Sequence, residues 1–255
     1  MIVKPIITNL IKVGDDLFET ISRNIKELPE RSVLVVTSKI ISVCEGRIIE
    51  KKTEERSEKH KIVKKEADLY INPTESKYDI MLTIKNNILA VNAGIDESNA
   101  NEHFILWPKD IQKKANSIWK FLRLHYKVNK VGVIITDSKT FPLKWGIVGT
   151  SIASCGFKGL FDYRGKKDIF GRILKMSQIN VAEALAVSAV FEMGEADEKM
   201  PLCLITDIPK IEFQSRIPSK KELNELLINI KDDVYAPVLT KAKWRKGNSI
   251  MVVRN

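Results

Sequence analysis

The sequence feature that most limits the fold is a pair of apolar runs, each of which ends abruptly in oxygen-bearing side chains. Residues 88–91 lead into a polar stretch that contains Asp96, and residues 131–135 lead into Asp137 and Ser138. Each run predicts a strand that delivers a carboxylate to a loop. Two carboxylates at the ends of two strands could share one hard cation, because such cations prefer oxygen ligands.

The size and composition of the chain limit the class of protein. With 255 residues, 44% of them hydrophobic, the chain has room for one large domain or two small ones. No apolar run reaches the roughly 18 residues that a membrane-spanning helix needs. The first residues lack the pattern of a secretory signal, so we expect a cytoplasmic protein. Three cysteines and three histidines, widely spaced, predict neither a disulfide framework nor a zinc site.

The net charge of +10 is consistent with an anionic partner, and the alternative is a chain that is basic throughout because it is rich in lysine. A nucleic acid is one possibility, and a polyanionic small molecule such as a nucleotide or a polyglutamate is another. The basic residues are interleaved with acids, and the sequence has no arginine-rich arm and no helix-turn-helix signature. Nucleic-acid binding is therefore the alternative from another functional class, and it predicts steeply salt-dependent binding.

Hydrophobic periodicity predicts a loose alternation of helices and strands. Helices are expected at 16–28, 52–70, 109–126, 178–193 and 218–231. Strands are expected at 32–38, 47–49, 131–135 and 201–206, with a hairpin over 80–91, and the basic tail 240–255 is expected to end in a short apolar strand. The regular βαβ period of a doubly wound fold is missing, so we expect a mixed α/β protein with α+β sheets.

Three acids are candidates for binding a divalent metal ion. Asp96 and Asp137 follow apolar runs, and Glu195 follows Gly194, whose small size allows a close approach to a phosphate. Mg²⁺ commonly takes one or two protein carboxylates together with substrate phosphates. The structural alternative is that the two aspartates cap a turn and a helix, and that Glu195 is a solvated helix end.

A basic turn between residues 162 and 172 is the second candidate site. Arg164 and Arg172, with two lysines between them, are suited to holding carboxylates or phosphates, and Asp168 lies among them. The alternative is a solvated charged surface. The sequence contains no GxxxxGK[ST] motif and no GxGxxG after a strand, which argues against a P-loop or a Rossmann fold.

At this point the residues resemble a known family. Five motifs occur in the family's order, namely Thr37-Ser38-Lys39-Ile40-Ile41-Ser42 with Glu45-Gly46-Arg47, Asn92-Ala93-Gly94-Ile95-Asp96-Glu97-Ser98-Asn99, Gly132-Val133-Ile134-Ile135-Thr136-Asp137-Ser138, Asp162-Tyr163-Arg164-Gly165-Lys166-Lys167-Asp168-Ile169-Phe170-Gly171-Arg172 and Met193-Gly194-Glu195. The chain is similar to the coenzyme F-420-0:gamma-glutamyl ligase family. The resemblance covers about residues 8 to 214.

The resemblance implies a nucleoside-triphosphate-dependent ligase that joins glutamate to a carboxylate through an amide, with GTP used by archaeal members. It also implies a homodimer of unusual α/β fold and a divalent ion, Mg²⁺ or Mn²⁺. The residues that match the family's metal positions are Asp96, Asp137, Ser138 and Glu195. The residues that fall in nucleotide-contacting segments are Leu10, Ile11, Ser38, Lys39, Asn99 and Gly194.

The sequence departs from the family pattern in one motif and in one region. Val43 stands where the family often has a lysine, so one phosphate contact is missing and a degenerate member that only binds nucleotide remains an alternative. Residues 138–149, 155–157 and 180–186 resemble the bacterial branch described as putative folate-metabolism gamma-glutamate ligases. This branch predicts a folate acceptor, and the deazaflavin precursor F-420-0 is the alternative acceptor.

The predicted reaction follows from these assignments. The γ-phosphate of GTP or ATP passes to the acceptor's carboxylate, and the amine of L-glutamate then attacks the acyl phosphate. Arg164, Asp168 and Arg172 are the predicted catalytic residues, which hold anionic substrate groups or structure their turn. Residues 1–215 are predicted to form the catalytic domain, possibly as two subdomains, with a C-terminal helix and basic tail, 216–255, packed on it.

Overall fold

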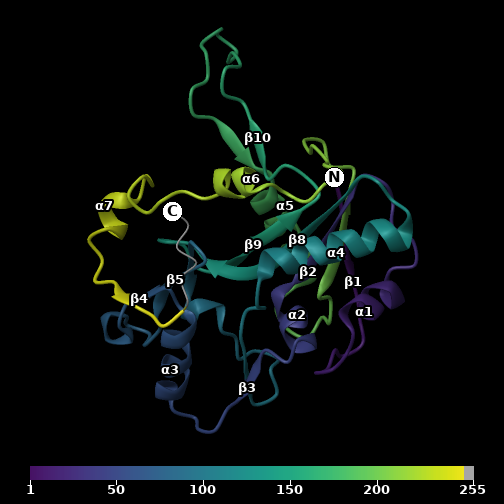
Figure 1. Cartoon of the computed structure of the whole chain (residues 1–255). Helices are drawn as coiled ribbons and strands as arrows, with labels where there is room; N and C mark the ends of the chain where they lie inside the picture. Colours follow the sequence, from purple (N-terminus) through teal and green to yellow (C-terminus); the bar gives the residue numbers. More distant parts are fainter. Residues whose placement is uncertain (250–255) are drawn as a thin grey trace.

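The structure is a computed structural model that describes residues 1–249. Its centre is a five-stranded sheet with the strand order β1-β12-β2-β8-β9 (Figure 1). The strands are β1 (Ile2–Ile6), β2 (Ser32–Thr37), β8 (Val131–Thr140), β9 (Ile147–Cys155) and β12 (Leu202–Thr206). Strands β2 and β8 run parallel, and the other neighbouring pairs are antiparallel.

Helices cover both faces of this sheet. The helices α1 (Leu17–Asn24), α2 (Ser38–Cys44) and α4 (Ile111–Tyr126) lie on one face, and α5 (Val181–Met193) lies on the other. Side chains alternate along a strand, so Leu34 of β2 packs in the core below α4 while its neighbour Val35 packs in the core below α5. Burial on both faces explains why β2 is an unbroken apolar run in the sequence.

A smaller sheet forms the second layer of the molecule, with the order β13-β4-β5-β6. Its strands are β4 (Leu69–Tyr70), β5 (Leu82–Lys85), β6 (Ile88–Val91) and β13 (Arg245–Lys246). The helix α3 (Arg56–Glu66), the 3₁₀ turns η1 (Pro73–Glu75) and η2 (Asn92–Gly94), and the strand pair β3 (Ile48–Glu50) and β7 (His103–Ile105) accompany it. A separate core that includes Val63, Met81 and Phe104 lies between these elements.

A long hairpin projects from the body of the molecule. It starts with the antiparallel strands β10 (Leu160–Asp162) and β11 (Gln178–Asn180), and residues 163–177 extend beyond them at the top of Figure 1. The short helices α6 (Lys220–Glu225) and α7 (Ala236–Leu239) follow β12 and lead to β13. Among residues 1–249, no helix has both the length and the apolar character needed to cross a bilayer.

The mixed α/β class is confirmed, and most predicted elements are present. The hairpin over 80–91 forms as β5 and β6, with both Asn86 and Asn87 at positive φ, as a two-residue hairpin turn demands. Gly194 ends α5 with φ 75°. The predicted apolar strand at the end of the basic tail falls mainly on 250–255, which lie outside the described residues. The predicted boundary at 215 stays a prediction.

Several predicted boundaries are wrong. The helix over 16–28 is only α1, because Ile25 is already extended with φ −117° and ψ 105°. The helix over 218–231 is only the six residues of α6, which Ser219 and Glu222 cap reciprocally. The largest error concerns the strand expected at 131–135. Strand β8 continues to Thr140, so Asp137 lies within a strand and not in a loop after one.

Candidate active site

The sheet topology brings the candidate residues to one edge of the central sheet, namely the edge at which the parallel strands β2 and β8 both end. In the parallel pair, Thr37 at the end of β2 lies opposite Thr136 of β8. The chain leaving β2 therefore enters α2 through Ser38 and Lys39 beside Asp137. Parallel strands present their carboxyl ends at the same edge, which is where α/β proteins usually place their ligands.

The antiparallel strands β1 and β12 add two more segments at this edge. Leu202, the first residue of β12, pairs with Val36 near the end of β2 and also with Ile6 at the end of β1. The segment that follows β1 contains Leu10 and Ile11, and Thr8 within it donates its backbone N–H to the carbonyl of Lys199 at 2.9 Å. Gly194 and Glu195 come just before β12. Apart from residues 96–99, each segment predicted to bind nucleotide or metal lies at this edge because it belongs to, follows or precedes a strand of the central sheet.

Asp137 is half-buried and firmly held. The pairing of β8 with β9 shifts register between Ile135 and Thr136, where Ile152 is an extra residue that bulges β9. One oxygen of Asp137, Oδ2, accepts a hydrogen bond from Nε1 of Trp107 at 2.5 Å. Burial raises the pKa of Asp137 to about 6, and the nearby negative charge of Asp96 adds to the increase. The carboxylate is therefore a costly negative charge that a cation would stabilise.

Asp96 lies on the neighbouring loop and is paired with a cation of the chain. The ammonium of Lys39 is 2.7 Å from Asp96 Oδ2 and also donates to the carbonyl and hydroxyl oxygens of Ser98, both at 3.0 Å. Burial alone would raise the pKa of Asp96, but Lys39 and the Ser98 hydrogen bonds outweigh burial and lower it. The Asp96 carboxylate is thus ionised in its protein environment and already binds one positive charge.

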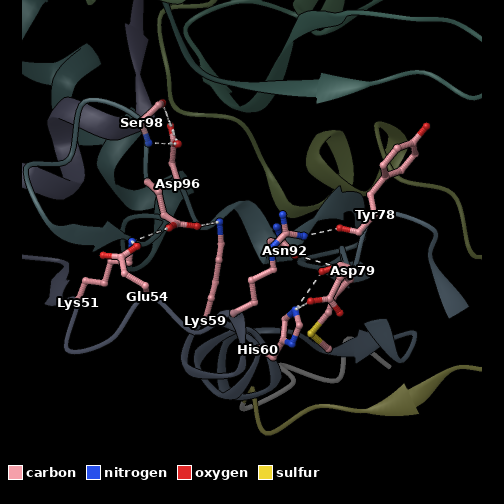
Figure 2. Close-up of polar contacts among 12 residues, drawn as sticks. Lys51, Glu54, Lys59, His60, Tyr78, Asp79, Asn92, Asp96 and Ser98 are labelled. Atoms are coloured by element: carbon pink, nitrogen blue, oxygen red, sulfur yellow. Dashed lines mark hydrogen bonds and ion pairs between the residues drawn. The ribbon is translucent and has the colours of Figure 1, made fainter. Parts of the chain in front are cut away.

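Two lysines hold the Asp96 loop from the opposite side. Lys59 of α3 forms an ion pair with Glu97 at 2.7 Å, and Lys51 lies 3.9 Å from the same carboxylate. In Figure 2, Lys51 and Lys59 extend toward the part of the loop next to Asp96 and Ser98. Elements around the smaller sheet therefore anchor this loop through Glu97. The preceding carboxylate, Asp96, pairs with Lys39 beside the central sheet.

Glu195 joins the site through two contacts. Ser138, which follows Asp137 in β8, donates its hydroxyl to Glu195 Oε1 at 2.5 Å. Asn99 donates its side-chain amide to the carbonyl of Ala196 at 2.7 Å, so the Asp96 loop touches the Glu195 segment. Gly194 is favoured here because its backbone angles, φ 75° and ψ 178°, are ones that residues with a Cβ rarely adopt.

The chemistry of this donor set fits a hard divalent ion. The side chains that the fold brings together carry carboxylate and hydroxyl oxygens, which Mg²⁺ and Mn²⁺ prefer. Within residues 1–249, however, no three acidic, histidine or cysteine side chains are grouped as a metal site requires. Asp96 and Asp137 lie close enough to interact electrostatically, and Ser138, next to Asp137 in the chain, is hydrogen-bonded to Glu195, but the three carboxylates are not grouped as one cluster.

The basic turn lies elsewhere. Strand β9 ends at Cys155 opposite Val133, near the start of β8, and the hairpin with Arg164 grows from that end of the sheet. Arg164 pairs with Asp162 at 2.7 Å. The Asp168 carboxylate accepts the backbone N–H groups of Phe170 and Arg172, each at 2.9 Å. A single chain therefore does not bring Arg164, Asp168 and Arg172 to the three acids.

Trp107 is the site residue that the sequence did not reveal. It lies between β7 and α4, outside any predicted strand, and its contact with Asp137 spans 30 positions. The sequence carries only one hint of it, which is Gly94. This glycine has φ +71°, and a Cβ there would lie 2.0 Å from Nε1 of Trp107. A glycine near an acid indicates that another group packs closely against the backbone there. Only the structure shows that this group is Trp107.

The mixed α/β fold thus gathers carboxylates, a lysine and a serine at one edge of the central sheet. Residues 5–207 match the family model described as F420-0:Gamma-glutamyl ligase. The chain therefore belongs to the F420-0:gamma-glutamyl ligase family, and it is an enzyme that forms γ-glutamyl amide bonds.

Curated relatives support the same assignment. A protein of Methanococcus maripaludis (strain C6) named coenzyme F420:L-glutamate ligase is 33% identical over 218 residues, which cover 81% of this chain and 85% of the relative. Proteins with the same name from Methanopyrus kandleri and Archaeoglobus fulgidus are 32% and 34% identical, and the alignments cover 79% and 77% of this chain and 85% and 83% of the relatives. The expected family is thereby confirmed.

Proposed function

We propose that this enzyme adds L-glutamate through a γ-linked amide to the deazaflavin coenzyme precursor F420-0. The observation that carries the proposal is the meeting of the Asp96, Asp137 and Glu195 segments at one edge of the sheet. The relatives named for coenzyme F420 favour the deazaflavin acceptor over the folate acceptor predicted from sequence, which is not confirmed. The family match also gives no support to the nucleic-acid-binding alternative.

The roles of the acids follow from their positions. Asp96, Asp137, Ser138 and Glu195 are the residues that would hold Mg²⁺ or Mn²⁺, together with oxygens of the substrate. The ion, when bound, neutralises charge on the β- and γ-phosphates of the nucleotide. Asp137 supports this role because burial leaves its charge in need of a cation.

The nucleotide, GTP or ATP, would occupy the same edge of the sheet. Lys39 is poised to bind a phosphate once a cation replaces it on Asp96, since its ammonium is the positive charge nearest that carboxylate. Asn99 and Gly194 flank the same space, and Ile11 and Ser38 belong to the segments that leave β1 and β2. Leu10 is exposed there and is available to contact the base or ribose.

The chemical steps need no side-chain nucleophile. The γ-phosphoryl group passes from the nucleotide to the acceptor's carboxylate, which gives an acyl phosphate and a nucleoside diphosphate. The amine of glutamate then attacks the acyl carbon, so that a C–N bond forms, the C–O bond to phosphate breaks and the amine loses a proton. The chain's part is to position the two carboxylate-bearing substrates and to exclude water.

We further propose that the active form is a homodimer. Large apolar side chains are exposed on the projecting hairpin, at the tip between β8 and β9, and on α5. Examples are Phe170, Trp145 and Phe191, which are 88%, 93% and 83% exposed. Exposed large apolar side chains are a feature of protein–protein contact surfaces. Sedimentation analysis tests this, and a strictly monomeric active enzyme would contradict it.

One experiment tests the reaction and the acceptor together. The enzyme is incubated with L-glutamate, a divalent ion, GTP or ATP, and either F420-0 or a monoglutamyl tetrahydrofolate, and the products are weighed by mass spectrometry. We expect one or more glutamyl units on F420-0 and none on the folate. Glutamylation of the folate alone would restore the folate acceptor, and no product with either would contradict the proposed substrates.

A further inference from the structure

The contact between Trp107 and Asp137 joins a buried aromatic ring to a carboxylate of the proposed metal site. Trp107 is 2% exposed, and its indole N–H points directly at Asp137 Oδ2, with 2.5 Å between the heavy atoms. A buried indole needs an acceptor for its single donor, and a half-buried carboxylate needs donors. The hydrogen bond satisfies both requirements at once.

The ring of Trp107 is fixed on several sides. Gly94 lies so close to the indole nitrogen that any side chain at that position would collide with it. The ammonium of Lys85 lies 5.6 Å from the centroid of the ring, within the range of a cation–π contact. The guanidinium of Arg47 donates from Nε to the backbone carbonyl of Trp107 at 3.3 Å. The indole therefore has little freedom to turn away from Asp137.

One carboxylate holds both cations behind the ring. Glu66, at the end of α3, pairs with Lys85 at 2.7 Å and with Arg47 at 2.9 Å. The Lys85 side chain is only 8% exposed, so its charge depends on this partner. Glu66, Lys85 and Arg47 form what we call the backing cluster, and through it the smaller layer of the molecule supports a side chain that reaches into the large sheet.

We propose that Trp107 is a positioning residue that holds the Asp137 carboxylate in its metal-binding orientation. The inference rests on the proposed function, in which Asp137 is a metal ligand. Because the indole holds Oδ2, the plane of the carboxylate cannot rotate freely. The charge of Asp137 therefore stays directed at the proposed nucleotide site, at the edge of the sheet where β2 and β8 end. Partners that orient a metal ligand in this way commonly change metal affinity or activity 10- to 100-fold when they are removed.

The variant Trp107→Phe tests the proposal, since it keeps an aromatic ring and removes the N–H. Trp119→Phe is the matched control. Trp119 is 3% exposed and donates its indole N–H to the carbonyl of Val131 at 2.9 Å, away from Asp137. We expect Trp107→Phe to weaken Mn²⁺ binding about tenfold by electron paramagnetic resonance and to lower kcat, with an unchanged KM for glutamate. Trp119→Phe should change neither quantity.

A second measurement observes Trp107 in the wild-type chain. With ¹⁵N-tryptophan labelling, the indole N–H signal of Trp107 should shift when Mg²⁺ and the active nucleotide are added, while that of Trp119 should not. Asp137→Asn should abolish the shift. An unmoved Trp107 signal, or a Trp107→Phe enzyme with normal Mn²⁺ affinity and kcat, would overturn the positioning role.

The failure of this inference is distinguishable from a failure of the proposed function. If Asp137→Asn retains full Mn²⁺ affinity and turnover, Asp137 is not a metal ligand and the proposed site itself is wrong. If Asp137→Asn loses both while Trp107→Phe behaves like Trp119→Phe, the metal site stands and only the role of Trp107 is refuted.

Discussion

The candidate active site and the projecting hairpin differ in how their charged side chains are held. At the end where β2 and β8 finish, Lys39 pairs with Asp96 and Trp107 with Asp137, in contacts between segments 30 or more residues apart. At the end from which the hairpin grows, Arg164 pairs with Asp162 only two residues away. The first set exists only when the whole fold is formed, whereas the second set belongs to a local turn.

This difference suggests separate duties for the two ends. Long-range contacts fix the acids relative to each other, which suits a metal site that needs fixed geometry. The hairpin turn shapes itself through Asp168 and carries its cations and its exposed Phe170 away from the body. In the proposed homodimer, a hairpin cation of one copy would bind substrate at the acids of the other copy.

The largest effect should come from removing an acid of the candidate active site. Asp96→Asn should lower kcat about 1,000-fold, because a metal ion typically supplies several kcal/mol of transition-state stabilisation. Steady-state assays with F420-0 measure this. The control is Asp110→Asn, which removes an exposed acid paired with Lys113 at 3.1 Å on α4 and should leave kcat unchanged. Normal turnover by Asp96→Asn would remove this residue from the site.

A steric change beside the same site should affect stability next most strongly. Gly94→Ala should cost about 3 kcal/mol, because it combines a strained positive φ with a collision against Trp107. Gly146→Ala also places a side chain at a positive φ, +93°, but the new methyl group meets nothing within 4 Å beyond its chain neighbours, so it should cost only about 1 kcal/mol. Urea unfolding measures both, and equal losses would refute the close packing of Trp107.

The backing cluster should make the free energy of unfolding of the protein sensitive to acid. Burial alone would raise the pKa of Glu66, but Lys85 and Arg47 outweigh it and lower that pKa. Glu66 therefore stabilises the fold above its unfolded pKa of about 4.3, and this stability is lost as the pH falls further toward the folded pKa.

Glu66→Gln should thus cost about 2 kcal/mol at pH 7, because it leaves two cations without their partner. The difference from the wild type should shrink below about pH 4, as the wild-type carboxyl becomes protonated. Unfolding curves at several pH values test this, with Glu54→Gln as the exposed control. A gap that stays constant down to pH 3 would show that Glu66 gains nothing from its charge.

The smallest effect should come from the hairpin. Arg164→Ala should raise the KM for the acceptor about tenfold, or about 1.4 kcal/mol, and leave the unfolding free energy unchanged, because its pair with Asp162 is exposed. Mixing the Arg164→Ala enzyme with the Asp96→Asn enzyme tests whether two copies of the chain share one active site. Activity recovered in the mixture would mean that one copy's hairpin serves the other copy's acids, and an unaltered KM would leave the hairpin without a role in substrate binding.

The sequence predicted the fold class and the family, but it did not predict how the residues of the candidate active site contact one another. Strand β2 and helix α5 were evident because a doubly buried strand and a capped helix each leave a local pattern, namely an unbroken apolar run and Gly194. The meeting of Lys39 with Asp96 was not predicted, since it depends on the parallel pairing of β2 with β8 and on a loop from another layer.

The extent of β8 shows the limit of local patterns. After Ile135 the strand turns polar, so periodicity indicated its end, yet pairing with β9 carries it on to Thr140. The glycine-rich composition around Gly149 hid β9, although that glycine is there to let α5 approach, since a Cβ would lie 2.5 Å from the carbonyl of Ala186. Both errors arise because tertiary pairing overrides local preference.

The pairing of β13 with β4 has a consequence for biosynthesis. Arg245 and Lys246 complete the edge of the small sheet opposite Tyr70 and Leu69, and Gly247 donates its N–H to the carbonyl of Asp68 at 2.9 Å. The ribosome makes β4 long before it makes β13, so the backbone groups along that edge lack their final partner while most of the chain is already translated. A layer that anchors the Asp96 loop is thus closed by a segment synthesised late.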